Sequence, residues 1–443
     1  MKPFSLLLAL CFLTAGPVPG QTQGTSPAES LDRVVQPLLD LDVFSGVVLV
    51  ARGDSVLATR AYGLADRAFA IPIAADHAFR VASISKSFTR ALVGVLVERG
   101  SLALDDPLAR WLPQFPSADR ITVRLLLDHR AGVPHVNSLP YDEESPVPNT
   151  LERLVDSIAR MPLDFEPGTD RRYSNGGYAI LGLVLEKAAG MSYERLLEEG
   201  ILAPLDLART GHEADGEIVP LLARGYEPSP EAFGRARRAP FQEMATKTGG
   251  GSLTSTASDL HRWAYAIGRD SILGPETWAE LFPEPDFVET GRSPGYNAAV
   301  ARRGEWIAVV LANNYAAGAA ADVAGSAIAL ARGDRPEPLP VVAPTALLPD
   351  VRDAAVGTYV LPPGMFPVPE VSIEARGEEL VAALAGIPFD VLVPQGERSF
   401  LARALWSRVT FDPPVDGRSP GIEVQPLYRP ESFHADRVEG GRP

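Results

Sequence analysis

The chain has 443 residues, of which 46% are hydrophobic and 22% charged, so it can form two or three folded domains and is not disordered by composition. Its formal net charge of −15 argues against a nucleic acid partner, because phosphate binding requires a cationic surface. The six histidines are dispersed without a His-Glu-x-x-His pairing, and no phosphate-binding loop is present, so we expect neither a metal nor another cofactor.

Residues 1–20 have the pattern of a secretory signal peptide. Lys2 precedes an apolar core at 6–13, and small residues with prolines follow near Gly20. The apolar core is too short for a membrane span, and no later segment is predicted to cross a membrane. The only cysteine, Cys11, lies inside this segment, so the mature chain would have neither disulfides nor a thiol nucleophile. We therefore expect an exported protein, periplasmic or extracellular.

The first part of the chain predicts one sheet covered by helices. Two β-type runs within 44–62 flank a turn at Arg52-Gly53-Asp54, and a second hairpin is predicted from 296–301 and 305–312. Amphipathic helices are predicted between and after them, at 84–99, 122–129, 176–189, 257–268 and 318–331. Strands from distant parts of the chain would then pair in a single sheet with helices packed on it.

A change of pattern near residue 333 predicts a domain boundary. Residues 333–344 are too rich in proline for a helix or a central strand. After them come short β-type segments divided by Gly, Pro and Asp, as in a small barrel or sandwich. We therefore expect an α/β (α+β) domain at 25–332, a linker at 333–344 and a small all-β domain at 345–443.

Ser83 and Lys86 form an S-x-x-K pair at the start of a predicted helix. Positions i and i+3 share a helix face, so the hydroxyl and the amine can reach one cavity. A desolvated lysine can activate a serine as its base. Only four of the 41 basic residues are lysines, which favours a chemical role for each one that is present. The alternative, a serine N-cap followed by a solvated lysine, is equally compatible with this stretch alone.

Tyr173 and Asn175 form a Y-x-N motif just before the predicted helix at 176–189. A lysine ammonium close to a tyrosine oxygen would lower the pKa of the phenol, so that Tyr173 could pass a proton between nucleophile and leaving group. The Asn175 amide could hydrogen-bond both the lysine and a substrate carbonyl. Taken singly, Tyr173 also fits a packed core tyrosine.

Several longer stretches occur in an order that resembles a known family. They are FRVASISKSFTRALVGVLVERGSLALDDPLARWLP, ITVRLLLDHRAGVP, YSNGGYAILGLVLEKAAGMSYERLLEEGILAPLDL and STASDLHRWA, within about 44–331. The chain resembles the serine β-lactamase and penicillin-binding family, in the class C-like branch that includes esterases, D-aminopeptidases and carboxypeptidases. The resemblance implies a helical subdomain beside the sheet. It also implies that Ser83 is the acylated nucleophile, Lys86 its activating partner, Tyr173 the general acid and base, and Asn175 a substrate-binding amide.

The third motif of the family is where this sequence departs. Lys247-Thr248-Gly249 spells the family triplet but precedes the S-T-x-x-D-L segment at 255–260, whereas the family triplet follows that segment. The matching position is Glu289-Thr290-Gly291, in which a carboxylate replaces the usual cation or histidine. We expect Glu289, Thr290, Gly291 and Arg292 to bind substrate, with the backbone N–H groups of Ser83 and Arg292 as the oxyanion hole.

A carboxylate at position 289 would repel a substrate carboxylate, which disfavours penicillins and D-Ala-D-Ala ends and favours a neutral ester or a substrate with a free amine. Alternatively, Glu289 points to solvent and carries no information on substrate. Lys247 could supply the missing positive charge at the rim of the pocket or pair with Glu289.

The sequence thus predicts an exported serine hydrolase that cleaves an ester or a small peptide-like amide. Two alternatives stay open: a true β-lactamase or D-Ala-D-Ala carboxypeptidase, and a catalytically weak binding protein that kept the fold.

Overall fold

A computed structural model describes the chain from residue 27 to residue 438. Within that span it leaves out residues 137–149, 214–217, 232, 270, 315–317, 337–338, 340–343, 363–367 and 428–430. The predicted signal peptide and part of the predicted linker lie outside the described residues. No described helix is both long and apolar enough to cross a membrane.

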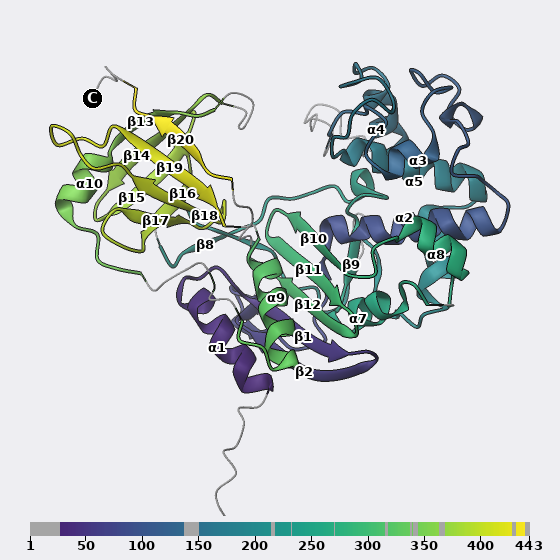
Figure 1. Cartoon of the computed structure of the whole chain (residues 1–443), viewed down its shortest axis with the longest axis horizontal. Coiled ribbons are helices and arrows are strands. Elements are labelled where there is room, and N and C mark those ends of the chain that lie inside the picture. The colour runs from purple at the N-terminus through teal and green to yellow at the C-terminus, as the bar shows by residue number, and fades with distance from the viewer. Residues whose placement is uncertain are drawn as a thin grey trace, which may run out of the picture.

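The centre of the first domain is a five-stranded antiparallel sheet in the order β10-β11-β12-β1-β2 (Figure 1). Its strands are β1 (Gly46–Arg52), β2 (Ser55–Tyr62), β10 (Phe287–Ser293), β11 (Tyr296–Arg303) and β12 (Trp306–Ala312). The N-terminal hairpin joins the C-terminal one through β1 and β12, with Val48 opposite Val310. The predicted sheet built from distant segments is therefore confirmed.

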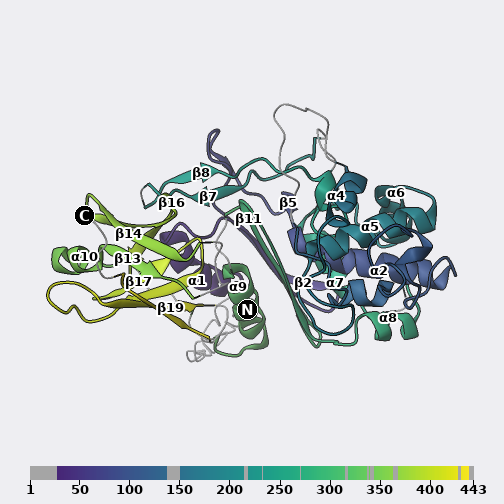
Figure 2. The same ribbon diagram turned by 90° about the horizontal axis from the view of Figure 1, so that it is seen from above.

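Both faces of this sheet are covered by helices, as the edge-on view shows (Figure 2). Val47 and Leu49 of β1 pack into the core shared with the larger helical layer, whereas Val48 and Val50 pack into a second core beneath α1 (Pro27–Asp40) and α9 (Ala319–Arg332). Burial on both faces explains why β1 reads as an unbroken apolar run rather than an alternating one.

The larger helical layer contains most of the remaining helices. They are α2 (Ser85–Glu98), α3 (Val123–Leu127), α4 (Leu151–Ile158), α5 (Asn175–Ala189), α6 (Tyr193–Leu197), α7 (Ala257–Ala266) and α8 (Pro275–Leu281), with a 3₁₀ turn at Leu108–Arg110 and a π-helical turn at Glu198–Leu202. All five predicted helices are present, as α2, α3, α5, α7 and α9, each within a few residues of its expected ends.

Short strands connect this layer to the sheet. They are β3 (Leu64–Asp66) with β4 (Ile71–Pro72), β5 (Phe79–Arg80) with β9 (Leu253–Ser255) and β6 (Gly211–His212), and the hairpin of β7 (Tyr226–Pro228) and β8 (Ala236–Arg238). None was predicted, because two or three residues are too few to show an alternating pattern.

The C-terminal part is an eight-stranded antiparallel sheet of consecutive strands, preceded by α10 (Pro349–Ala355). Its strands are β13 (Gly357–Val360), β14 (Glu370–Arg376), β15 (Glu379–Leu384), β16 (Ile387–Pro394), β17 (Ser399–Ala402), β18 (Ser407–Phe411), β19 (Gly421–Pro426) and β20 (Phe433–Asp436). A bridge between Tyr359 and Arg437 brings the two edges together, so the sheet is almost a closed barrel around an apolar interior. The expected all-β domain is confirmed.

Trp406 of this domain packs against the first domain. It is fully buried in the same core as α1 and α9, and its indole N–H donates to Asp322 Oδ2 at 2.8 Å. Val393 and Leu401 enter the same core. The two domains are therefore joined by a common hydrophobic core and not only by the linker.

Candidate active site

Ser83 lies in a 3₁₀ turn, Ala82–Ile84, that runs directly into α2. Strand β9 fixes this turn from one side: Val81 N donates to Leu253 O at 3.0 Å, and Leu253 N donates to Ser85 Oγ at 3.1 Å. Ala82 has a positive φ of 46°, an uncommon conformation for alanine. The nucleophile candidate is thus held on a constrained backbone at the start of a buried helix.

Strand β10 approaches the same turn from the other side. A Cβ at Gly291 would overlap the carbonyl oxygen of Val81 and lie 3.2 Å from the backbone nitrogen of Ser83. The glycine predicted from the family triplet therefore serves a close backbone approach. Arg292, the next residue, is the predicted second donor of the oxyanion hole.

Lys86 is buried one turn after Ser83. Its Nζ donates to Ser83 Oγ at 3.2 Å and to the carbonyl oxygen of Gly250 at 2.7 Å. Burial, aided by the positive charge of Lys247, lowers the pKa of Lys86 to about 7. At neutral pH a large fraction of Lys86 is uncharged, so the amine can accept the Ser83 proton.

Tyr173 contacts the nucleophile directly, with its Oη 2.7 Å from Ser83 Oγ. The Nζ of Lys86 lies over the Tyr173 ring, 4.9 Å from its centre, rather than beside the hydroxyl. Burial raises the pKa of Tyr173, and this outweighs the opposing effects of the Ser83 hydrogen bond and of Arg292. The expected lowering of the Tyr173 pKa by lysine is therefore wrong, because desolvation of the phenol is the larger effect. A phenol that stays protonated is suited to donate a proton.

Two histidines hold Tyr173 in place. The rings of His129 and His135 have their centres 4.6 and 5.6 Å from that of Tyr173. His129 Nδ1 accepts a hydrogen bond from the backbone N–H of Ser174, and burial lowers the pKa of His129 to about 4. His129 is therefore neutral near pH 7, and it packs against the Tyr173 ring.

Asn175 is the first residue of α5, whose N-cap is Ser174. The Ser174 hydroxyl accepts from Gly177 N at 3.0 Å and donates to Pro134 O at 3.0 Å, which fixes the helix start beside the loop that carries His135. The backbone N–H of Asn175 points at His135 Nδ1 at 3.4 Å. This arrangement places Asn175 in the wall of the cavity that contains Ser83.

That cavity has a volume of about 860 Å³. Of the predicted site residues, Ser83, Asn175 and Arg292 line it, and Tyr173 adjoins it through its bond to Ser83. Thr290 and Glu289 are not among the described residues that line it. The remaining lining residues, none of them predicted except Lys247, are Ala82, Val136, Glu227, Pro240, Phe241, Gln242, Glu243, Thr246, Lys247, Thr248, Gly250, Gly251, Ser293 and Pro294.

The carboxyl group of Glu289 faces helix α2 instead. It accepts a hydrogen bond from Ser87, its Oε2 is buried without a hydrogen-bond partner, and the guanidinium groups of Arg90 and Arg302 lie near enough to stabilise its charge. Burial nevertheless raises the pKa of Glu289 to about 7. Neither position considered from the sequence, in the pocket or in solvent, is the one observed, so the charge of Glu289 gives no direct reason to exclude an anionic substrate.

The Lys247-Thr248-Gly249 triplet forms a turn rather than a strand. Lys247 O accepts from the N–H groups of both Gly250 and Gly251, and the carbonyl of Gly250 is the one that holds Lys86. Gly249 has a φ of 77°, and a Cβ there would overlap the carbonyl oxygen of Tyr178. The triplet is therefore not the third motif, yet it supports the site by positioning Lys86. Three consecutive glycines were the available sequence signal for this role.

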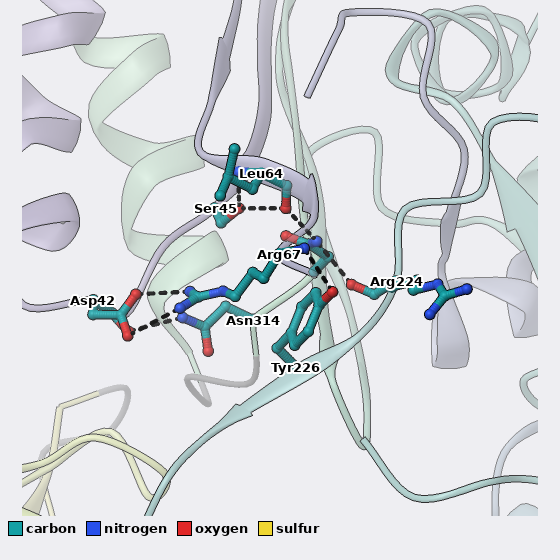
Figure 3. A network of polar contacts seen from close by, with 8 residues as sticks. Asp42, Ser45, Leu64, Arg67, Arg224, Tyr226 and Asn314 are labelled. Atoms are coloured by element: carbon teal, nitrogen blue, oxygen red, sulfur yellow. Dashed lines mark hydrogen bonds and ion pairs between the residues drawn. The ribbon is translucent and has the colours of Figure 1, made fainter. Parts of the chain in front are cut away.

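Glu227 of strand β7 forms part of one wall of the cavity. A network of polar contacts around the neighbouring Tyr226 holds this strand in place (Figure 3). Tyr226 Oη accepts from the backbone N–H of Arg67 at 2.8 Å, and the Arg67 guanidinium pairs with Asp42 at 2.7 Å. Buried Asn313 donates to the carbonyls of Leu64 and Arg224 at 2.9 and 2.8 Å. These contacts fasten the cavity wall to the end of the central sheet.

Among the described residues, no three His, Cys, Asp or Glu side chains gather as a possible metal site. The groups available for catalysis are a serine, a lysine of lowered pKa and a tyrosine. This cluster, on a helix beside an antiparallel sheet, defines the serine β-lactamase-like class of proteins.

Residues 31–308, more than half of the chain, match the family model described as Beta-lactamase, and the chain belongs to that family. The predicted resemblance and fold are confirmed. Esterase EstB of Burkholderia gladioli is 32% identical over 289 residues, which cover 58% of this chain and 74% of the esterase. Penicillin-binding protein 4* of Bacillus subtilis is 28% identical over 283 residues, 60% of this chain and 61% of the relative, so the chain spans less than two thirds of that protein.

Solved structures extend the likeness. The D-amino acid amidase from Ochrobactrum anthropi SV3, complexed with L-phenylalanine amide, has a TM-score of 0.56 at 25% identity and covers 64% of this chain and 92% of its own. The octameric penicillin-binding protein homologue from Pyrococcus abyssi has a TM-score of 0.60 at 20% identity over 92% of this chain and 99% of its own. At that identity the likeness concerns fold alone, and its extent includes the all-β domain.

Proposed function

We propose that this protein is a serine hydrolase that cleaves an ester or a small peptide-like amide through an acyl-enzyme on Ser83. The observation that carries the proposal is the double contact of Ser83 Oγ, 2.7 Å from Tyr173 Oη and 3.2 Å from Lys86 Nζ. A nucleophile bonded to two proton-transferring groups is the arrangement that acyl transfer requires.

In the proposed reaction, neutral Lys86 accepts the Ser83 proton while Oγ attacks the substrate carbonyl. The oxyanion forms near the backbone N–H groups of Ser83 and Arg292. Tyr173 donates its proton to the leaving oxygen or nitrogen as that bond breaks, and proton transfer from Lys86 restores the phenol. Water then attacks the acyl-enzyme along the same proton path in reverse and releases the acid.

The relatives support this reaction class, since one is named an esterase and another an amidase. A true β-lactamase or carboxypeptidase is the second candidate. Its substrates carry a carboxylate, and the Glu289 carboxyl group, which does not line the cavity, would not repel them. Export remains part of the proposal and depends on the pattern of residues 1–20. N-terminal sequencing of the mature protein recovered outside the cytoplasm would test it.

A fluorophosphonate probe separates a hydrolase from a binding protein. We expect the wild type to be labelled and Ser83→Ala not to be; equal labelling of the two would remove Ser83 as the nucleophile. Comparing turnover of nitrocefin with that of 4-nitrophenyl esters then separates the two enzyme candidates. Fast nitrocefin turnover would favour the β-lactamase.

A further inference from the structure

The cavity of Ser83 contains a cation that the family comparison does not explain. Lys247 lines this cavity from the 3₁₀ turn Ala245–Lys247, whereas Arg292 lines it from strand β10. It is one of only three lysines after residue 2, and Lys86, the first of them, is in the catalytic cluster. The other, Lys187, is exposed on α5.

The backbone of Lys247 is fixed relative to the catalytic groups. Its N–H donates to Met244 O at 2.9 Å, and its carbonyl accepts from Gly250 and Gly251 at 2.9 and 2.8 Å. Gly250 in turn accepts from Lys86 at 2.7 Å. A single rigid turn therefore sets both the position of the catalytic amine and the origin of the Lys247 side chain.

The Lys247 ammonium is half-buried and acts on the catalytic centre. Burial lowers the pKa of Lys247, and Arg80 lowers it further. Lys247 in turn lowers the pKa values of Lys86 and His135, so its charge lies within electrostatic range of both. Arg80 itself is paired with both oxygens of Glu213, at 2.6 and 2.7 Å. A bound anion would stabilise the partly desolvated ammonium group of Lys247.

Two carboxylates, Glu227 and Glu243, line the cavity together with these cations. Glu227 is paired with Arg237 at 3.0 Å. Glu289 is turned toward Ser87 on α2. Lys247 and Arg292 are the cations among the described lining residues, and both lie in the cavity with Ser83.

We infer that Lys247 binds a carboxylate of the substrate, so that the enzyme prefers esters or amides with an acid group near the scissile carbonyl. This inference rests on the hydrolase function proposed above and names its substrate class. It differs from the neutral or amine-bearing substrate expected from Glu289, because the charge that faces the substrate comes from Lys247.

Two matched ester pairs test the preference. Mono-(4-nitrophenyl) glutarate against 4-nitrophenyl valerate places the acid on the acyl side, and 3-(valeryloxy)benzoate against phenyl valerate places it on the leaving group. We expect the wild type to prefer the acid in at least one pair. Lys247→Met should reduce that preference in kcat/KM by about 10- to 100-fold, as for loss of one hydrogen bond to a charged group. Lys247→Arg, which keeps the charge, should retain most of it, and Lys187→Met should retain all of it.

The ratio within a pair separates binding from the effect of Lys247 on Lys86, since a change in the pKa of Lys86 affects both members alike. An unchanged ratio in Lys247→Met, or no preference in either pair, overturns the inference while Ser83-dependent turnover preserves the hydrolase function. If the wild type turns over no ester, the esterase part of the proposed function fails, and a binding measurement then tests the anion site by itself. In that case, titration calorimetry of Ser83→Ala with mono-(4-nitrophenyl) glutarate should show binding at least about tenfold tighter than in Ser83→Ala/Lys247→Met. Equal binding would overturn the site.

Discussion

Gly291→Ala tests whether the close approach of β10 to the nucleophile turn is needed for catalysis. A Cβ at this position would overlap the carbonyl of Val81 and come 3.2 Å from Ser83 N. Both neighbours are backbone atoms, so no side-chain rotation can relieve the overlap, and the strand and the turn must separate. A shift of about 1 Å in a catalytic arrangement costs about 100-fold in rate, and we expect kcat for 4-nitrophenyl valerate to fall by that factor.

The assay is nitrophenolate release, with thermal unfolding measured on the same samples to separate misplacement from unfolding. Gly325→Ala in α9 is the matched control, because nothing lies within 4 Å of the added carbon. It should leave kcat unchanged and stabilise the helix by about 0.5–1 kcal/mol. A Gly291→Ala protein with kcat within about threefold of wild type, where about 100-fold is expected, would refute the reasoning.

Other variants test the proton path and the domain contact. The value of kcat/KM should rise with pH through about 7, because only neutral Lys86 accepts the Ser83 proton. Lys86→Met should remove most of the activity. A kcat/KM profile that is flat from pH 5 to 9 would contradict this role of Lys86. Tyr173→Phe should lower kcat by about 10²- to 10⁴-fold with little change in melting temperature, and an effect on KM alone would argue against proton donation. Trp406→Ala should cost about 3–5 kcal/mol in urea unfolding, since it empties the core between the domains; a cost below about 1 kcal/mol would mean that the domains pack independently.

The fold was largely predictable because its main elements carry local patterns. The helix expected at 84–99 is α2, Ser85–Glu98, and the apolar runs at 44–62 became the hairpin of β1 and β2. The contact between the two domains was not predictable. Trp406 lies in the turn between β17 and β18, and nothing local in the sequence indicates that its ring enters the core beneath α9 rather than that of its own sheet.

The catalytic residues could be predicted from their sequence motifs, but the directions in which side chains point could not. The S-x-x-K and Y-x-N motifs identified Ser83, Lys86 and Tyr173, and the structure brings both Lys86 and Tyr173 within hydrogen-bond distance of Ser83 Oγ. The direction of Glu289 could not be read, because side chains on a strand alternate between faces and a shift of one residue exchanges them. The pKa of Tyr173 depended on a balance between burial and charge, and burial is a tertiary property.

Glu289→Gln distinguishes a buried structural carboxyl from a substrate-binding one. Burial raises the folded-state pKa of Glu289 from 4.5 to about 7, so the folded protein holds this proton more tightly than the unfolded chain. Wild-type stability should therefore fall as pH rises from about 4.5 to 7, by about 3 kcal/mol at most from this group. Glutamine does not ionise, so urea unfolding should show Glu289→Gln gaining on the wild type by about that amount between pH 5 and pH 8. A carboxylate facing the substrate would instead give Glu289→Gln a stronger preference for the acidic esters and an unchanged pH dependence of stability. That result would mean that Glu289, and not Lys247, determines the substrate preference.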